Sequence, residues 1–495
     1  MQRTVIRVHP GMTIGPVDPR IFGGFLEHMG RAVYGGIFEP DSPLADAFGC
    51  RTDVLSHLEQ LDMSVMRYPG GNFVSGYHWR DGVGPVEQRP TVRELAWNSL
   101  EPNTFGTDEF LSLCERMAWT PMMAVNLGTG TPEEAREWVE YCNAPIGTTS
   151  SDLRASHGRT DPYRVGLWCL GNEMDGPWQL GHVPAEEYAA RAKAAAQLMR
   201  EVDPAISTVV CGSSTPDLAS YLEWDRVVLE QLGEDADFLS VHRYVNNLGG
   251  DTPEFLASGR QIDRQIEEAD AVCRFVQGRT RSRKRPYLCF DEWNVWYKDF
   301  EMDGHGAVAP HLIEEVYNLE DALVVAGFLN SFIRRADVVR IANLAQIVNV
   351  IAPLLTRGDD LLVQSIFHPF QMMSARRRGS SLRVVVDGPT YSTRESGEVP
   401  FLDVSAIVDD GLLHLFIVNR STDHPAPLEI DVAAISALTF VDAELLTGPG
   451  AKAVNDFGAP PVVSPHAFDD VTSSGAIART ELPPLSFLAA SFTMA

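Results

Sequence analysis

The chain contains eight short apolar segments with strand character, and they alternate with polar or glycine-rich loops and with segments of helical periodicity. Parallel strands need long crossover connections, usually helices, so this alternation is typical of a parallel α/β sheet. Eight units over about 350 residues predict a (β/α)8 barrel, which we place at residues 16–377. The expected barrel strands are residues 21–28, 64–68, 121–126, 164–172, 207–212, 237–242, 287–293 and 338–343.

A doubly wound open sheet is the alternative arrangement of the same elements. Its ligands bind where the strand order reverses, commonly at a glycine-rich phosphate loop. The sequence contains no GxGxxG or P-loop motif, which favours the closed barrel.

The character of the sequence changes at about residue 378. Helical periodicity disappears, and short strands separated by turn residues follow to the end of the sequence. This pattern predicts an antiparallel β-sandwich of the jelly-roll type. Residues 4–9 alternate polar and apolar side chains, so we expect the sandwich domain to combine residues 1–15 with residues 378–495.

Charge and cysteine content restrict the partners. The net charge of −27 argues against nucleic acid and anionic membranes, because both are bound through basic patches. The seven cysteines are scattered without a CxxC pair, which favours buried thiols in a reducing compartment over a metal site. The first residues show no signal-peptide apolar region, and no 18-residue apolar span occurs, so we expect a cytoplasmic protein that does not enter a membrane.

Polar residues stand at the end of almost every predicted barrel strand. The carboxyl ends of barrel strands share one pocket, and active sites of such barrels lie there. Amides and carboxylates beside tryptophans, without a set of metal ligands, suit a neutral sugar. The strand-end residues are Glu27, His28, Asn72, Asn126, Asn172, Glu173, His242, Arg243, Tyr244, Asp291, Glu292 and Gln346, with Trp97, Trp178, Trp293 and Trp296 in nearby loops.

Two of these residues, Glu173 and Glu292, follow strands four and seven in the contexts Asn-Glu and Asp-Glu. Glycoside hydrolysis needs one carboxylic acid to protonate the leaving oxygen and a second carboxylate as nucleophile or base. At the separation of about 5 Å that retaining enzymes require, mutual repulsion would keep one of the two protonated. Asp291 is an alternative nucleophile, but adjacent strand residues point to opposite faces, so we expect only one of Asp291 and Glu292 to face the pocket.

Each of these residues also has a purely structural interpretation. A lone strand-end glutamate is more often an ion-pair or helix-cap residue, and His242 could be a core histidine. The tryptophans could anchor loops, and Asn72 could be a turn residue after two glycines.

Seven stretches, in order along the whole barrel, resemble the α-L-arabinofuranosidases of glycoside hydrolase family 51. They are GFLEH at 24–28, Gly30-Arg31-Ala32-Val33-Tyr34-Gly35-Gly36-Ile37, RYPGGNF at 67–73, WCLGNEMDGPWQ at 168–179, SVHRYVN at 240–246, FDEWNVWY at 290–297 and AQIVNVIAP at 345–353. The resemblance implies removal of terminal non-reducing α-L-arabinofuranosyl residues from arabino-oligosaccharides by a retaining double displacement.

The resemblance also implies residue roles. It makes Glu173 the acid/base and Glu292 the nucleophile. It implies no cofactor, cytoplasmic action on short neutral oligosaccharides, and a hexamer built as a trimer of dimers. Loops 73–107 and 298–319 are where we expect specificity to be set. The implied sugar-binding residues are Glu27, Asn72, Asn172, His242, Tyr244, Gln346, Arg67, Trp97, Trp178 and Trp296.

Three rival functions remain open from the sequence. A β-xylosidase or an endo-β-glucanase could use the same barrel and the same two carboxylates. A non-catalytic sugar-binding protein would be expected to lose one of the two glutamates, and both are present. An isomerase or aldolase barrel usually shows a phosphate loop, a Schiff-base lysine or metal ligands, and the sequence offers no such set.

Overall fold

The protein forms a closed eight-stranded parallel barrel with a second, mostly antiparallel sheet packed against one side. The structure is a computed structural model and describes residues 3–298 and 306–495. The barrel order is β10-β11-β2-β3-β6-β7-β8-β9. Its strands are β2 (Gly23–Phe25), β3 (Val65–Tyr68), β6 (Thr120–Val125), β7 (Leu167–Leu170), β8 (Ser207–Cys211), β9 (Phe238–Val245), β10 (Tyr287–Val295) and β11 (Val339–Ala345).

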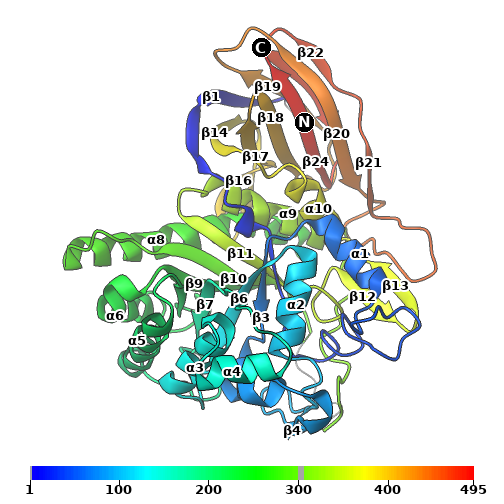
Figure 1. Cartoon of the computed structure of the whole chain (residues 1–495). Helices are drawn as coiled ribbons and strands as arrows, with labels where there is room; N and C mark the ends of the chain where they lie inside the picture. Colours follow the sequence, from blue (N-terminus) through cyan, green and yellow to red (C-terminus); the bar gives the residue numbers. More distant parts are fainter. Residues whose placement is uncertain (1–2, 299–305) are drawn as a thin grey trace.

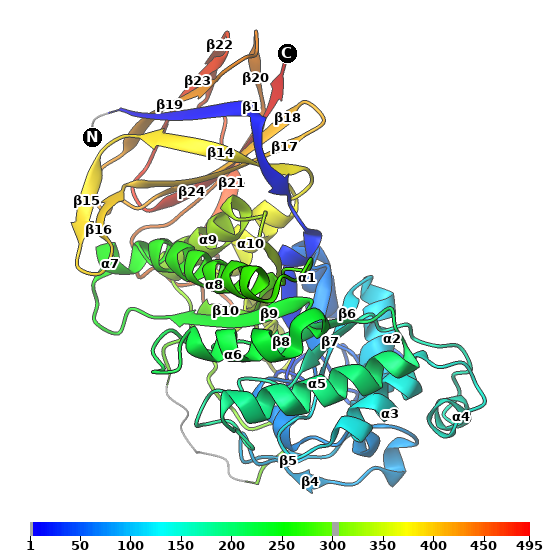
Figure 2. The ribbon, with the colours of Figure 1, turned by 90° about the vertical axis from the view of Figure 1, so that its left-hand side faces the viewer.

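Helices surround the barrel and connect its strands (Figure 1). The mostly apolar helix α9 is buried along nearly its whole length, because it lies between the barrel and the second sheet (Figure 2). Within the described residues, no helix combines the length and the apolar character needed to cross a membrane. The helices are α1 (Thr52–Leu61), α2 (Thr107–Met117), α3 (Pro132–Asn143), α4 (Thr149–Ser156), α5 (Ala185–Val202), α6 (Glu223–Leu232), α7 (Thr252–Leu256), α8 (Gly259–Thr280), α9 (Leu319–Arg334) and α10 (Phe367–Ser374).

The second domain is one ten-stranded sheet in the order β21-β20-β24-β18-β17-β14-β1-β19-β23-β22. The first strand of the chain pairs with β14 antiparallel and with β19 parallel, so the N-terminus joins this sheet as predicted. Side chains from both ends of the sheet share one apolar core, so the sheet coils upon itself. Its strands are β1 (Thr4–Pro16), β14 (Ser380–Asp387), β17 (Leu402–Asp409), β18 (Leu412–Asn419), β19 (Ala426–Val432), β20 (Leu438–Thr447), β21 (Ser464–Ala467), β22 (Thr472–Ser474), β23 (Ile477–Leu482) and β24 (Ser486–Met494).

The sequence predicted the (β/α)8 barrel and the attached β domain, and both are confirmed. Several short elements were not predicted because they are two to four residues long: the strand pairs β4 (Val92–Arg93) with β5 (Leu100–Glu101), β12 (Leu354–Arg357) with β13 (Asp360–Val363), and β15 (Thr390–Thr393) with β16 (Gly397–Pro400). The division at residues 15/16 and 377/378 stays a prediction.

A buried ion cluster joins the barrel to the sheet. Asp403 of β17 is buried and contacts Arg334 of α9 at 2.9 Å and Arg420 at 3.1 Å. Its second oxygen accepts a hydrogen bond from the amide of Asn330 at 3.0 Å. Burial opposes ionisation of Asp403, but the two guanidinium groups outweigh it and lower the pKa of this carboxyl. Asp403 therefore contacts both arginines at the junction, while Asp263 of α8 gives Arg334 a second carboxylate partner at 3.1 Å and leaves Asp403 as the carboxylate that pairs with Arg420.

We expect the substitution Asp403→Ala to destabilise the protein by about 3–5 kcal/mol, because removing one partner leaves buried arginine charge uncompensated. Urea denaturation followed by circular dichroism measures the change. The matched control is Asp387→Ala, which breaks the exposed pair with Arg7 at 3.1 Å and should cost less than about 1 kcal/mol. Equal effects of the two substitutions would contradict a structural role for the buried cluster.

Candidate functional site

A cavity of about 410 Å³ opens at the carboxyl ends of the barrel strands. It is lined by Glu27, Met29, Asn72, Ala96, Trp97, Glu173, Trp178, Ser214, Thr215, Tyr244, Glu292, Trp296, Gln346 and Ile351. The family resemblance implied two catalytic and ten sugar-binding residues, and nine of these twelve are in the cavity wall. The other three, Arg67, Asn172 and His242, lie buried behind the wall and contact the glutamates or one another.

Glu292 enters the barrel interior through an irregularity in β10. The register of β10 with β9 shifts between Cys289 and Glu292, which adds a residue to one strand. As a result both Asp291 and Glu292 contact the guanidinium of Arg67, at 3.2 and 2.6 Å. The expectation that these neighbours point to opposite faces was wrong, because the bulge breaks the alternation. Glu292 alone of the two lines the cavity.

Trp293, the residue after Glu292, points away from the cavity. Trp293 was among the tryptophans expected near the pocket. Instead its side chain is fully buried and stacks on Phe328 of α9, with ring centroids 5.0 Å apart. Trp293 therefore belongs to the core between the barrel and α9.

Glu173 follows β7, which ends at Leu170. Gly171 has φ +87° and Glu173 itself has φ +43°, a left-handed conformation that costs a non-glycine residue about 1–2 kcal/mol. This turn directs the carboxylate back over the barrel. One oxygen of Glu173 lies 2.8 Å from Nδ1 of His242, and the other accepts a hydrogen bond from the indole of Trp178 at 2.5 Å.

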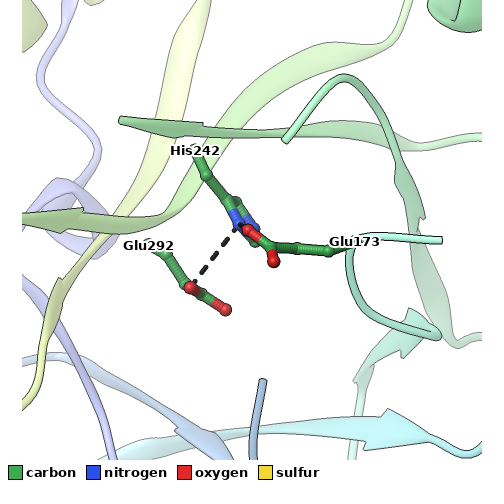
Figure 3. A group of neighbouring side chains, drawn as sticks. All are labelled: Glu173, His242 and Glu292. Carbon is green, nitrogen blue, oxygen red and sulfur yellow. Dashed lines mark hydrogen bonds and ion pairs between the residues drawn. The ribbon is translucent and has the colours of Figure 1, made fainter. Parts of the chain in front are cut away.

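The two glutamates meet at His242. One carboxylate oxygen of each glutamate and one ring nitrogen of His242 all lie within 4.8 Å of one another. Figure 3 shows the imidazole adjoining both carboxylates, 3.5 Å from Glu292. Burial favours the neutral imidazole, but the charges of Glu292 and Asp291 outweigh it and raise the pKa of His242 well above its usual value. The repulsion argued from the sequence is therefore moderated by an imidazolium.

Glu292 is held by donors on both oxygens. Arg67 contacts one oxygen at 2.6 Å, and the hydroxyl of Tyr244 donates to the other at 2.9 Å. Burial raises the pKa of Glu292, while His242 and Arg67 oppose that rise and Glu173 adds to it. These contacts fix the direction of the carboxylate.

The three groups Glu173, His242 and Glu292 are also ligand types that metal ions accept. A cation there would compete with the guanidinium of Arg67 and with a protonated imidazole, and this electrostatic setting disfavours it. The prediction that the site uses no metal or cofactor stays a prediction.

Glu27 forms the opposite wall and approaches Glu292 across two glycines. Its carboxylate accepts hydrogen bonds from the backbone of Phe73 and the indole of Trp97, both at 3.0 Å. A Cβ on Gly71 would lie 2.9 Å from a Glu292 oxygen and 3.2 Å from a Glu27 oxygen. Glycine is therefore required where the chain passes between the two carboxylates. Burial, together with the charge of Glu292, raises the pKa of Glu27 to about 8.

Sequence reasoning missed Ser214 and Thr215, which follow β8 and line the cavity. Strand five was the one barrel strand for which no polar end residue had been named, although Gly-Ser-Ser-Thr follows it directly. Conversely, Asn126 does not line the cavity, because its side chain binds the backbone of Gly128 and Thr129 in a turn.

A closed parallel barrel with two facing glutamates in a sugar-sized cavity defines the class: a barrel glycoside hydrolase. Residues 57–260 match the family described as the α-L-arabinofuranosidase 1 domain, and residues 291–486 match the α-L-arabinofuranosidase C-terminal domain. The second match begins inside β10, so it includes the second half of that strand and all of β11.

Relatives that align with 98–99% of this chain are named α-L-arabinofuranosidases as well. An intracellular exo-α-(1→5)-L-arabinofuranosidase of Bacillus subtilis (strain 168) is 42% identical over 98% of both chains. One of Streptomyces lividans is 43% identical over 98% of this chain and 75% of its own length. The solved structure of a family 51 α-L-arabinofuranosidase from Bifidobacterium longum aligns with a TM-score of 0.95, 35% identity and 99% coverage of both chains. The chain belongs to the family 51 α-L-arabinofuranosidases.

The raised pKa of Glu27 predicts a pH-dependent stability. Between about pH 4.5 and about pH 8 the folded protein holds a proton on Glu27 that the unfolded chain releases, so this group's contribution to stability decreases as pH rises through that window. Glu27→Gln removes the titration. We therefore expect the Tm of the variant relative to the parent to increase from roughly pH 5 to roughly pH 8, while kcat/KM falls. The exposed Glu59→Gln is the control, and a Tm difference independent of pH would contradict the assignment.

Proposed function

We propose that this chain is an exo-acting, retaining α-L-arabinofuranosidase that hydrolyses terminal non-reducing α-L-arabinofuranosyl residues from arabino-oligosaccharides. Glu173 is the acid/base and Glu292 is the nucleophile. The carrying observation is the approach of the two carboxylates to within 4.8 Å, because retaining enzymes hold them about 5–5.5 Å apart and inverting enzymes about 6.5–9.5 Å apart.

The reaction follows from this geometry in two steps. An oxygen of Glu292 bonds to the anomeric carbon as the bond to the leaving oxygen breaks, and the proton of Glu173 passes to that oxygen. Glu173, now a carboxylate, takes a proton from water as the water oxygen bonds to the anomeric carbon and Glu292 departs. Arg67 and Tyr244 keep Glu292 in the attacking orientation throughout.

The cavity wall supplies groups for the sugar hydroxyls. Glu27, Asn72 and Gln346 present oxygens and amides beside Glu292, and Trp97, Trp178 and Trp296 present aromatic faces. Asn172 is buried, and its side-chain oxygen accepts a hydrogen bond from Arg67 at 2.7 Å. Its side-chain NH2 group is therefore the part that we assign to sugar binding. His242 and Arg67 complete the site from behind by holding the carboxylates.

Exo action is supported by contact between the two long loops. The amide of Leu100 donates to the carbonyl of Ala307 at 2.9 Å, and the amide of Gly306 donates to Asn98 at 3.0 Å. Loop 73–107 thereby meets loop 298–319, of which residues 299–305 lie outside the described residues. A bridge of this kind turns an open cleft into a pocket for a chain end. The structure of a bifunctional glucanase-xylanase aligns at 13% identity and a TM-score of 0.60, which reflects the shared fold alone.

The substrate and location that we propose rest on the names of the relatives, and the proposed assembly rests on the family resemblance. The relatives above are named intracellular and exo-α-(1→5)-specific, while one from Bifidobacterium longum, 40% identical, is named exo-α-(1→6)-specific. We propose cytoplasmic action on arabinose-containing oligosaccharides and a hexamer built as a trimer of dimers. Sedimentation velocity of the purified 54.5 kDa chain measures that assembly.

A panel of 4-nitrophenyl glycosides tests the activity, with the product anomer followed by NMR. We expect the α-L-arabinofuranoside to be hydrolysed fastest and its first-formed product to keep the α configuration, because two displacements at one carbon restore it. A dominant rate on the β-xyloside or β-glucoside, or inversion of configuration, would contradict the proposal.

The glutamate variants assign the roles within the same assay. Glu173→Ala and Glu292→Ala should each lower kcat/KM for a natural substrate by at least about 10²-fold. Added azide should rescue both variants with opposite stereochemistry. In Glu173→Ala it attacks the covalent intermediate and gives the α-azide, whereas in Glu292→Ala it attacks the substrate directly and gives the β-azide. Near-normal turnover in Glu292→Ala would contradict the nucleophile assignment.

A further inference from the structure

The turn that follows β8 is anchored by two carboxylates, the buried Asp225 and the half-buried Asp175. Asp225 of α6 accepts hydrogen bonds from the backbone amide of Ser213 at 2.7 Å and from its hydroxyl at 2.8 Å. Asp175 accepts from the amide of Ser214 at 2.9 Å and from its hydroxyl at 3.0 Å. Two consecutive serines are thus each held at backbone and side chain, so the turn has little freedom to move.

Neither carboxylate forms an ion pair with a cation in the described part of the chain. Asp225 is fully buried, and the second oxygen of Asp175 is buried without a hydrogen-bond partner. Burial raises the pKa of Asp225 to about 6 and that of Asp175 to about 7. Removing these carboxyl groups from water without a cationic partner is unfavourable for folding, and the hydrogen bonds that they accept from Ser213 and Ser214 hold the turn rigid.

The turn borders the catalytic cavity on the side of the proton donor. Ser214 and Thr215 line the cavity, and Asp175 lies two residues after Glu173 in the loop that also carries Trp178. The sugar that is attacked lies against the nucleophile Glu292 and its neighbour Glu27. A general acid must stand beside the oxygen that leaves. The wall next to Glu173 therefore faces the leaving group.

Of the two hydroxyl groups in this wall, that of Thr215 makes the weaker hydrogen bonds within the protein. Its contacts are with Asp217 in the same turn, at 3.3 Å from the hydroxyl to the carboxylate and 3.2 Å from the amide to the hydroxyl. The first contact is longer than an ordinary O–H···O hydrogen bond, and the second lies at the upper end of the N–H···O range. A sugar hydroxyl can displace the first of them at small cost, whereas the hydroxyl of Ser214 is engaged with Asp175.

We propose that the turn 213–215 is the subsite for a neutral leaving sugar. The Thr215 hydroxyl contacts that sugar directly, and Asp175 is a positioning residue that holds the turn through Ser214. This inference rests on the proposed function. The ligand class is a hydroxyl-bearing pyranosyl or furanosyl acceptor. The same surface receives an acceptor sugar that attacks the covalent intermediate in place of water.

Two measurements on the purified protein test this subsite. The first compares kcat/KM for an α-L-arabinofuranosyl disaccharide with kcat/KM for 4-nitrophenyl α-L-arabinofuranoside. The second uses the nitrophenyl substrate with added arabinose or xylose and measures the ratio of transfer product to hydrolysis product. This ratio compares two fates of one intermediate, so a general loss of folded enzyme does not change it.

Thr215→Val should lower kcat/KM for the disaccharide about three- to tenfold, the effect of one neutral hydrogen bond, and change the nitrophenyl rate less than about twofold. Thr215→Ser keeps the hydroxyl and should keep both values. Asp175→Ala removes the acceptor of both Ser214 hydrogen bonds and should lower the transfer-to-hydrolysis ratio at least about threefold, whereas Asp175→Asn keeps an acceptor oxygen there and should keep most of the parental ratio. The matched control is Ser220→Ala, on the same connection but outside the catalytic cavity, which should leave both measurements unchanged.

Two outcomes overturn the inference while leaving the proposed function intact. One is an equal loss on both substrates in Thr215→Val with an unchanged transfer ratio. The other is a parental transfer ratio in Asp175→Ala. Failure of the parent protein to hydrolyse the nitrophenyl arabinofuranoside would instead overturn the proposed function.

Discussion

The site depends on one buried guanidinium. Arg67 projects from β3 into the barrel with about 1% of its side chain exposed, and it contacts Asp291, Glu292 and Asn172 at once. Burial opposes its charge, but the carboxylates of Asp291 and Glu292 outweigh that and raise its pKa well above the usual value. A buried pair is tolerated only where charge and hydrogen bonds are matched. Without Arg67, adjacent carboxylates could not stand inside the barrel.

The balance of charge around Arg67 sets which groups carry protons. Four carboxyl groups, Glu27, Glu173, Asp291 and Glu292, share the barrel mouth with two cations, Arg67 and His242. Asp291 has its pKa lowered, with Arg67 and His242 overcoming burial, so it stays charged. Glu27 has its pKa raised to about 8, so it stays largely neutral at neutral pH. Two cations then face one charged carboxylate outside the catalytic pair, so a single negative charge on that pair balances the cluster, and this is the condition under which one glutamate can be acid while the other is nucleophile.

The barrel and most of the polar residues at its open end could be predicted from the sequence. The end of each strand is marked there by an apolar run that stops at a polar residue. Three features could not be read in that way. The bulge in β10 turns both Asp291 and Glu292 inward, and no local pattern marks it. The parallel pairing of β1 with β19 joins segments more than 400 residues apart. Whether the two long loops meet depends on backbone hydrogen bonds, which side-chain identity does not encode.

The rigidity of the site comes from the layer of the barrel beneath it. Alternate residues of a strand face the same side, so on three strands an inward apolar residue stands two positions before an inward polar one. The apolar layer is a closed cluster of fully or nearly fully buried side chains. A packed interior fixes the rotation of every strand about its axis. It therefore also fixes the direction of the polar side chains in the next layer toward the carboxyl ends of the strands. The paired positions are Val65 with Arg67, Phe238 with Ser240, and Cys289 with Asp291. The barrel core thereby performs the positioning that a catalytic group on a free loop would lack.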